Sequence, residues 1–382
     1  MQTGSIAEGR TGRELRAWLL LGALFAVGIF ASLAGREVRS GAFLIGDCPY
    51  YASTAVSLWE DGDFDLANQL KGGLVVHQKQ IALGRDGRWL PKHPVLMPVL
   101  SVPFYALFGL PGFLVFNVVV ILLLASVVYA IARTYLEPGW ALGAVVLMFG
   151  TSFLREYVYN YSPDLLSTLL VLGGILLILR RHPFPGGILL GVSVLAKVTN
   201  LFVAALVVGF LPFRKGRRET LKAAAGVVPG MAGWMLLNLA LFGGATVTGY
   251  DRTLVLQDGV AQTVSHKGFF DLPLLEGMSG QLFDPRAGLL TTSPILLLAI
   301  PGFLLFLRKH PWDGALFLGI SEFLFLLFST YRWWATSHYG NRFLMLPVTL
   351  ACVPIGFALQ VLVERLRDVP IRRRAEAASG SR

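Results

Sequence analysis

Long hydrophobic segments separated by short polar ones make up most of this chain. A helix needs about 20 mostly apolar residues to cross a bilayer, with roughly 17 to 25 as the usual range. The segments that meet or approach this length are Leu15–Gly35, Phe113–Arg133, Gly139–Leu154, Leu165–Leu179, Leu221–Phe242, Leu289–Leu307, Trp312–Ser329 and Phe343–Val363. This pattern predicts an all-α, polytopic membrane protein.

One further apolar stretch, Phe184–Phe213, is too long for an ordinary span and carries Lys197 and Asn200 near its middle. Basic residues flank it at positions 180–181 and 214–218. Because lysine and arginine concentrate in cytoplasmic loops, both flanks belong on the cytoplasmic side. The stretch must then be a hairpin that crosses the membrane and returns, which brings the total to about ten spans.

The basic loops also set the orientation, because with about ten spans all of them fall on one side. We predict that residues 1–363 form one transmembrane domain and 364–382 a basic cytoplasmic tail, with both termini cytoplasmic. The outer face then carries two long loops, Arg36–Gly112 and Gly243–Gly288. Within the first, Pro94–Phe108 is apolar but holds three prolines, which lack backbone donors. We interpret it as an interfacial helix.

Composition agrees with this interpretation. The chain is 54% hydrophobic and only 15% charged, whereas soluble domains carry about 25% charged residues. The net charge of +10 does not indicate nucleic acid, because the basic residues lie in short loops and the tail. We predict that Leu15–Gly35 is retained, since no convincing cleavage site follows it. Cys48 and Cys352 lie in different settings and give no basis for a disulfide or a metal site.

The first outer loop contains an unusual polar stretch, GDCPYYASTAVSLWEDGDFDL, at residues 46–66. Asp47 precedes Pro49 and an amphipathic segment, Tyr50–Trp59, so it is either a helix N-cap or a functional carboxylate. Three later aspartates imitate the start of a calcium loop but lack its glycine and final glutamate. We interpret them as a solvated turn; they are Asp61, Asp63 and Asp65.

Other charged residues lie at the outer ends of predicted spans. Lys92 is placed to hold a lipid phosphate or to extend to head groups, and Asp164 opens a predicted helix that it could cap. Arg342 lies on the predicted outer side, although basic residues concentrate on the cytoplasmic side. We therefore expect it to have an anionic partner. Lys197 and Glu322 are intramembrane charges that are either functional or paired with each other. Hydrolase, P-loop and metalloprotease motifs are absent from the sequence.

Several segments together resemble the GT-C superfamily of integral membrane glycosyltransferases, nearest to bacterial members akin to protein O-mannosyltransferases and aminoarabinose transferases. In chain order they are the stretch at 46–66, PKHPVLMPVLSVPFYALFG, YSPDLLSTLL, GILLGVSVLAKVTN, LNLALFGGATVTGY, FDPRAGLLTTSPILLLAIPG and HYGNRFLMLP. The resemblance implies a polyprenyl-phosphate sugar donor, Asp47 as the general base, and Lys92 and Arg342 as phosphate contacts. It also implies a substrate cavity lined by Tyr51, His93, Asp164, Tyr250, His338 and Tyr339.

The sequence departs from the superfamily at Cys48, where a second acid often stands. This weakens any metal-bridging role, so we assign no metal site and no cofactor, and a divalent cation stays an open alternative. The prediction is a membrane glycosyltransferase that acts on the extracytoplasmic face, and the resemblance to bacterial members implies a bacterial inner membrane. Its acceptor hydroxyl belongs to a lipid, a glycan or a protein.

Two other functions remain open at this point. One is a polytopic transporter or flippase of lipid-linked sugars or other solutes, with Lys197 and Glu322 at its midplane. The other is an acceptor-binding subunit of an envelope-assembly complex. The enzyme is favoured because the charged clusters gather on one outer face and no internal repeat is visible in the sequence.

Overall fold

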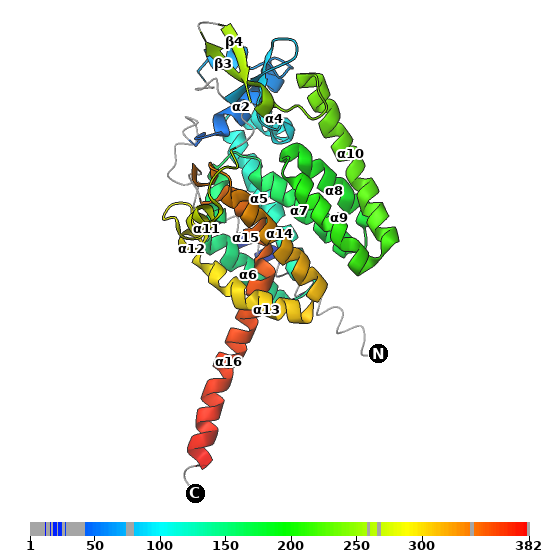
Figure 1. Cartoon of the computed structure of the whole chain (residues 1–382). Coiled ribbons are helices and arrows are strands. Elements are labelled where there is room, and N and C mark those ends of the chain that lie inside the picture. The colour runs from blue at the N-terminus through cyan, green and yellow to red at the C-terminus, as the bar shows by residue number, and fades with distance from the viewer. Residues whose placement is uncertain are drawn as a thin grey trace.

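The computed structural model describes residues 43–73, 80–257, 260–265, 269–336 and 340–379, and positions 12, 16, 18–20, 22–24 and 27. Most of the predicted first span, Leu15–Gly35, lies outside these residues. The described part is a helical bundle with a small sheet at one end and the C-terminal helix projecting from the other (Figure 1). We call the first of these the sheet end of the bundle.

The bundle helices follow the apolar segments of the sequence. Their bounds are α5 (Pro111–Ala132), α6 (Pro138–Thr151), α7 (Asp164–Leu179), α8 (Pro183–Ala196), α9 (Asn200–Lys215), α10 (Arg217–Phe242), α13 (Ala299–Lys309), α14 (Pro311–Ser329), α15 (Met345–Leu350) and α16 (Cys352–Ser379). Short helical pieces connect them: η2 (Phe153–Tyr159), η3 (Gly249–Arg252), α11 (Leu274–Phe283), α12 (Leu289–Thr292), η4 (Pro294–Leu298), η5 (Trp334–Thr336) and η6 (Arg342–Leu344). Buried apolar side chains from α5, α6, α7, α14, α15 and α16 form one continuous core.

Among the described residues, three helices are long and apolar enough to cross a membrane, namely α5, α10 and α14. Two bent helix pairs raise this number to five if each pair is one span. Helices α4 (Leu96–Phe108), α7 and α8 are apolar but shorter. The expected total of about ten spans therefore stays a prediction.

The stretch Phe184–Phe213 is divided into two helices, α8 and α9, as the hairpin prediction requires. Helix α8 packs closely against α10 because glycines face each other across the contact. A Cβ atom on Gly187 would lie 2.1 Å from the carbonyl oxygen of Ala223, and one on Gly230 would lie 2.1 Å from the backbone of Gly191. Small residues of this kind allow helix backbones to approach closely in membrane proteins.

The sheet corrects the all-α prediction. Strands β1 (Ile81–Leu83) and β2 (Trp89–Pro91) come from the first predicted outer loop, and β3 (Thr253–Gln257) and β4 (Val260–Val264) come from the second. They form an antiparallel sheet in the order β2-β1-β3-β4, with Ala82 opposite Thr253. Strands of three to five residues are too short for an alternating pattern to identify them. The sheet joins two loops that are far apart in the sequence.

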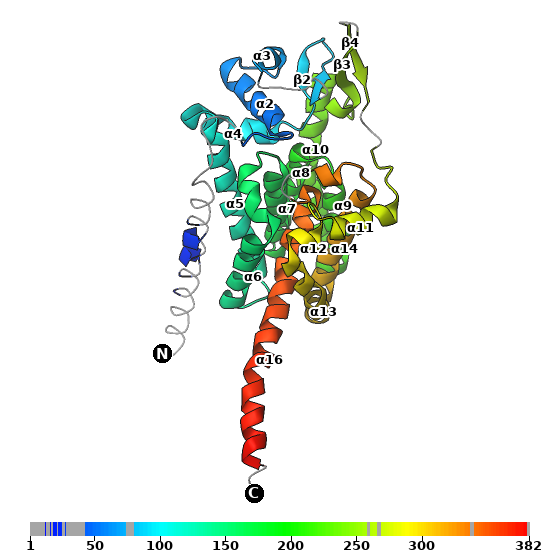
Figure 2. The ribbon, with the colours of Figure 1, turned by 90° about the vertical axis from the view of Figure 1, so that its left-hand side faces the viewer.

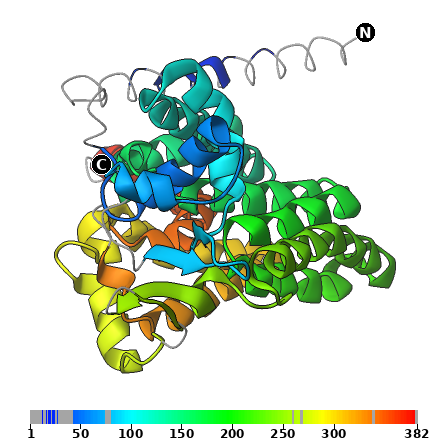
Figure 3. The same ribbon diagram turned by 90° about the horizontal axis from the view of Figure 1, so that it is seen from above.

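Helices α2 (Cys48–Glu60), α3 (Ala67–Lys71) and α4 gather around this sheet above the bundle (Figure 2). Viewed from above, they and the strands cover part of the bundle end (Figure 3). A small hydrophobic cluster formed by Tyr50, Leu66, Ile81 and Leu254 connects α2 to the strands. Helix α4, the predicted interfacial element, has 13 residues and so measures only about 20 Å, less than a bilayer core.

Candidate functional site

Asp47 and Arg342 form an ion pair at the sheet end of the bundle. The Nη2 atom of Arg342 lies 2.5 Å from Oδ2 of Asp47. Asp47 occupies the N-cap position of α2, yet its side chain makes no capping hydrogen bond within the described part of the chain. Helix α2 instead starts with a proline in its first turn, whose fixed φ suits that position. The carboxylate is therefore available to Arg342, at the start of η6.

The charges in this pair depend on each other. Burial is the largest single effect and raises the pKa of Asp47, but Arg342 and the other positive groups around the carboxylate together outweigh it, so the pKa lies below its ordinary value. Burial acts against the charge of Arg342 as well, while Asp47 and then Asp164 raise its pKa well above the usual value. The side chains are 19% and 20% exposed, for Arg342 and Asp47 respectively. Both groups are thus ionised at neutral pH and partly accessible.

His93 lies beside this pair, surrounded by the rings of Tyr50, Tyr51 and Tyr250. Its Nδ1 is 2.9 Å from the hydroxyl of Tyr250 and its Nε2 is 3.0 Å from Oε1 of Gln80. With the amide oxygen as acceptor, Nε2 carries the proton and Nδ1 accepts from Tyr250. Tyr51 packs against the imidazole with ring centroids 5.1 Å apart. Burial lowers the pKa of His93 to about 4, so the ring is neutral and positions its neighbours.

Lys92 adds a second cation to the same cluster. Its Nζ lies 5.4 Å from the ring centroid of Tyr250. Burial lowers the pKa of Lys92 to about 8, although the charge of Asp47 partly opposes this. Gly249 makes the arrangement possible, because a Cβ atom there would lie 2.4 Å from the carbonyl oxygen of Lys92. The lysine is therefore held between the sheet and the turn that carries Tyr250.

Asp164, at the start of α7, is paired with Lys197. The Nζ atom of Lys197 lies 2.7 Å from Oδ1 of Asp164, and the hydroxyl of Ser162 donates to the other oxygen at 3.0 Å. The suggested pairing of Lys197 with Glu322 is wrong, since Glu322 is exposed on α14. The physical reason is that the break between α8 and α9 places Lys197 beside the first turn of α7.

The structure brings together most of the residues singled out in the sequence. Asp47, Lys92, Arg342, Tyr51, His93 and Tyr250 form one cluster, and the charge of Asp164 acts on Arg342. His338 and Tyr339 lie outside the described residues. Sequence reasoning missed Gln80, for which no signal exists, and did not place Lys197 in the site. The signal that could have placed Lys197 in the site was its position as a lone charge in the middle of an apolar stretch.

The three aspartates after α2 form a hydrogen-bonded turn. Asp61 accepts from the side chains of Asn68 and Gln69 at 2.7 and 2.8 Å, and Asp63 accepts from the backbone of Asp65 at 2.8 Å. Their oxygens are thus used within the turn. Across the described ranges, no group of three or more His, Cys, Asp or Glu residues is placed to hold a metal ion.

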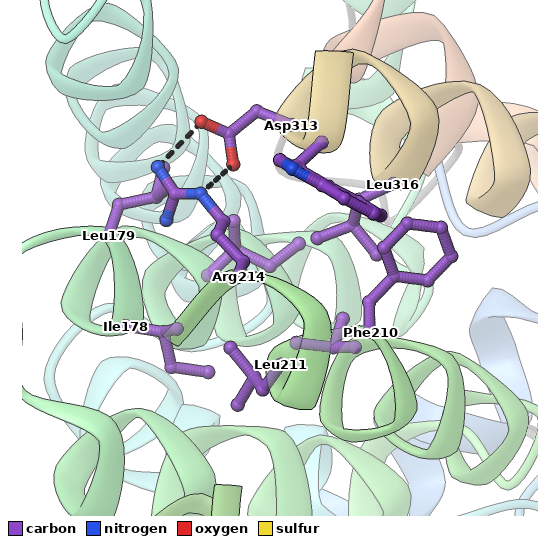
Figure 4. Close-up of a pocket in the computed structure, with 10 residues that line it drawn as sticks. Ile178, Leu179, Phe210, Leu211, Arg214, Asp313 and Leu316 are labelled. Atoms are coloured by element: carbon purple, nitrogen blue, oxygen red, sulfur yellow. Dashed lines mark hydrogen bonds and ion pairs between the residues drawn. The ribbon is translucent and has the colours of Figure 1, made fainter. Parts of the chain in front are cut away.

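A small apolar pocket lies at the opposite end of α7 (Figure 4). Arg214 and Asp313 form a bidentate ion pair there, with both nitrogen–oxygen distances at 2.6 Å. Ile178, Leu179 and Leu316 are among the apolar residues that line it. Helix α7 has 16 residues, so this pocket is about 24 Å from the Asp164 end of the helix. Its ion pair connects the last turn of α9 to the first turn of α14 and is not part of the charged cluster.

Comparisons with known proteins agree with the fold. The model of glycosyltransferase family 87 matches residues 92–354, more than half of the chain. No curated protein matches the sequence. Among solved structures, ArnT from Cupriavidus metallidurans bound to undecaprenyl phosphate is similar, with a TM-score of 0.60 and 15% identity over 90% of this chain and 60% of that one.

The apo oligosaccharyltransferase of Archaeoglobus fulgidus is also similar, with a TM-score of 0.55 and 12% identity over 98% of this chain and 52% of that one. This chain therefore spans about half to three fifths of the length of these proteins. The family match, together with the shared fold, confirms the GT-C resemblance predicted from the sequence. At such low identity the solved structures bear on the fold alone, and the long apolar helices of this chain agree with an integral membrane protein.

Proposed function

Because the chain belongs to glycosyltransferase family 87, we propose that it moves a sugar from a polyprenyl-phosphate donor to an acceptor hydroxyl, with Asp47 as the general base. The observation that carries this proposal is the ion pair of Asp47 with Arg342 next to Lys92. It combines a base with cations suited to phosphate. The undecaprenyl phosphate bound to ArnT supports a lipid phosphate on the donor.

The reaction needs few groups from the protein. The acceptor oxygen forms a bond to the anomeric carbon of the sugar while the bond from that carbon to the phosphate oxygen breaks. The electron pair leaves with the phosphate, which is a stable anion and needs no acid. The proton of the acceptor hydroxyl passes to Asp47, and Arg342 and Lys92 receive the phosphate.

Donor binding also activates the base. In the free protein the guanidinium of Arg342 keeps the pKa of Asp47 low, which makes Asp47 a weak proton acceptor. A donor phosphate on Arg342 competes with Asp47 for the same cation. As the ion pair loosens, burial dominates and the basicity of Asp47 rises. Asp47 thus becomes a competent base only when a donor is present.

The neutral ring of His93, with Tyr51 and Tyr250, orients groups around the carboxylate. Catalysis takes place on the extracytoplasmic face, where the lipid donor meets the outer loops, and the acceptor is a lipid, a glycan or a protein. A transporter with Lys197 and Glu322 at its centre has less support. Lys197 pairs with Asp164 next to Arg342, whereas Glu322 is exposed on α14.

The direct test is to incubate the purified full chain with labelled polyprenyl-phosphate sugars and candidate acceptors, and to measure release of polyprenyl phosphate. We expect release that requires an acceptor and is lost in Asp47→Asn. Release that is equal in both proteins would contradict the base assignment. Repeating the assay with a chelator and then with magnesium tests the open question of a divalent cation.

A further inference from the structure

The break between α8 and α9 is held by specific hydrogen bonds and is not a frayed helix end. Lys197 has an extended backbone, with φ −156° and ψ 114°. The carbonyl of Ser193 accepts from the backbone of Lys197 and from the side chain of Asn200, both at 3.0 Å. Asn200 also donates to Ser167 of α7 at 2.8 Å. Irregular backbone at membrane depth persists only where protein or a cavity supplies such partners, so Lys197 is held in a defined place.

That place is next to Arg342. Both cations contact the ring of Phe343, with Nζ of Lys197 at 5.0 Å and Cζ of Arg342 at 5.1 Å from its centroid. The ring of Phe328 adds a second aromatic contact to Lys197, at 5.5 Å. Aromatic faces attract cations without neutralising them. Lys197 is thus close to the ion pair of the site and shares an aromatic contact with it.

The proposed reaction changes the charge on the lipid phosphate. In the donor this phosphate is a diester with one negative charge. In the product it is a monoester with a charge of about −1.5 to −2 at neutral pH, as for other phosphate monoesters. Interactions that strengthen as charge develops are those that accelerate a reaction. A cation can provide such an interaction if it is paired with a carboxylate of the protein before the reaction. It would then leave the carboxylate and bind the phosphate as the charge on the phosphate increases.

We propose that Lys197 is that cation, and that it exchanges Asp164 for the lipid phosphate as the sugar leaves. This inference rests on the proposed function and names a further residue that acts on its donor. Lys197 keeps its protons and only changes partner. Asp164 retains the hydroxyl of Ser162 as a donor, so it is not left without a hydrogen bond. The lysine side chain is 19% exposed and that of Asp164 only 5%, so the cation is the more accessible member of the pair.

The test measures the affinity of the purified full chain for undecaprenyl phosphate and for a sugar-bearing polyprenyl phosphate. Lys197→Met should weaken undecaprenyl phosphate binding about tenfold or more, the loss of one charge-assisted contact, and should weaken donor binding less. Lys197→Arg should retain most of the affinity for undecaprenyl phosphate. Asp164→Asn should tighten undecaprenyl phosphate binding, because the lysine is released. Lys222→Met, on an exposed lysine of α10, is the matched control.

A purely structural ion pair predicts a different pattern. Both Lys197→Met and Asp164→Asn would then lower thermal stability and weaken or leave unchanged the binding of undecaprenyl phosphate, which would overturn the inference. Unchanged binding in Lys197→Met together with weakened binding in Arg342→Ala would overturn the inference and leave the proposed function intact. If the unsubstituted protein binds neither lipid, the proposed function falls, and the inference with it.

Discussion

The guanidinium of Arg342 lies 2.5 Å from the carboxylate of Asp47, although 295 positions separate the two residues in the chain. One group comes from the start of α2 and the other from the start of η6, just before the last helices of the bundle. The pair joins a candidate base to a candidate phosphate contact. Changes at either residue should therefore affect both catalysis and donor binding.

Asp47→Asn should keep the fold and lose proton acceptance. Removal of a general base typically costs about 10²–10⁴-fold, so turnover should fall by that factor, as measured by polyprenyl phosphate release. Because the carboxylate makes no capping hydrogen bond within the described residues, Asp47→Ala should be no less stable than Asp47→Asn in a thermal melt. Asp61→Asn, in the exposed turn, is the control and should retain turnover. Full turnover in a folded Asp47→Asn protein would exclude Asp47 as the base and make Asp164 the next candidate.

Arg342→Ala should weaken donor use and shift the pH profile. A charge-assisted contact is worth about 1.5–3 kcal/mol, so kcat/KM for the donor should fall by about one to two decades. Without the guanidinium, burial raises the pKa of Asp47. A base acts only when deprotonated, so the acid limb of the kcat/KM profile should move to higher pH. An unshifted limb would indicate that Asp47 is not the titrating base.

Donor binding should depend on the protonation of Lys92. Burial lowers the pKa of this lysine to about 8, so its positive charge is lost as the pH rises through that value. The donor KM should therefore increase between roughly pH 7 and 9. Lys92→Arg should abolish this increase, because arginine stays charged. An identical alkaline increase in Lys92→Arg would assign the effect to another group.

His93 should make the protein less stable in mild acid. Its folded pKa is about 4, below the ordinary value of about 6.5. As the pH falls through 6.5 the unfolded chain takes up a proton that the folded protein refuses, so stability is lost until the pH reaches the folded value. The loss is at most about 3 kcal/mol, and less because the imidazole is partly accessible. Thermal melts of His93→Gln should lack this part of the pH dependence.

The orientation can be tested by cysteine labelling in intact cells. A cysteine at Lys71, which is exposed at the end of α3, should react with an impermeant reagent. One at Gly216, in the exposed turn between α9 and α10, should react only after the membrane is opened. Cys48 and Cys352 are buried and should contribute little background. Labelling of the cysteine introduced at Gly216 in intact cells would show that the orientation is the reverse of the one assigned.

The sequence by itself was sufficient to locate most of the helical segments, although Leu289–Leu307 and Phe343–Val363 are each divided into shorter helices. Apolar segments became helices because a helix satisfies its own backbone hydrogen bonds, and this depends only on residues three to four positions away. The stretch Phe184–Phe213 is interrupted at Lys197 in the structure, as its length and its lysine indicated. The GT-C resemblance was likewise visible in the ordered motifs and is confirmed by the family match.

Only the tertiary structure decided which charged residues meet. Asp47 was compatible with a cap or with a base until Arg342 was found beside it, and Lys197 was compatible with Glu322 until α7 placed Asp164 within 2.7 Å. The sheet is a similar case, because β1 and β3 pair across two separate loops. Ion pairs and strand pairing depend on distance in space. The pattern of charge and hydropathy along a chain does not give that distance, because it is determined only when the helices pack.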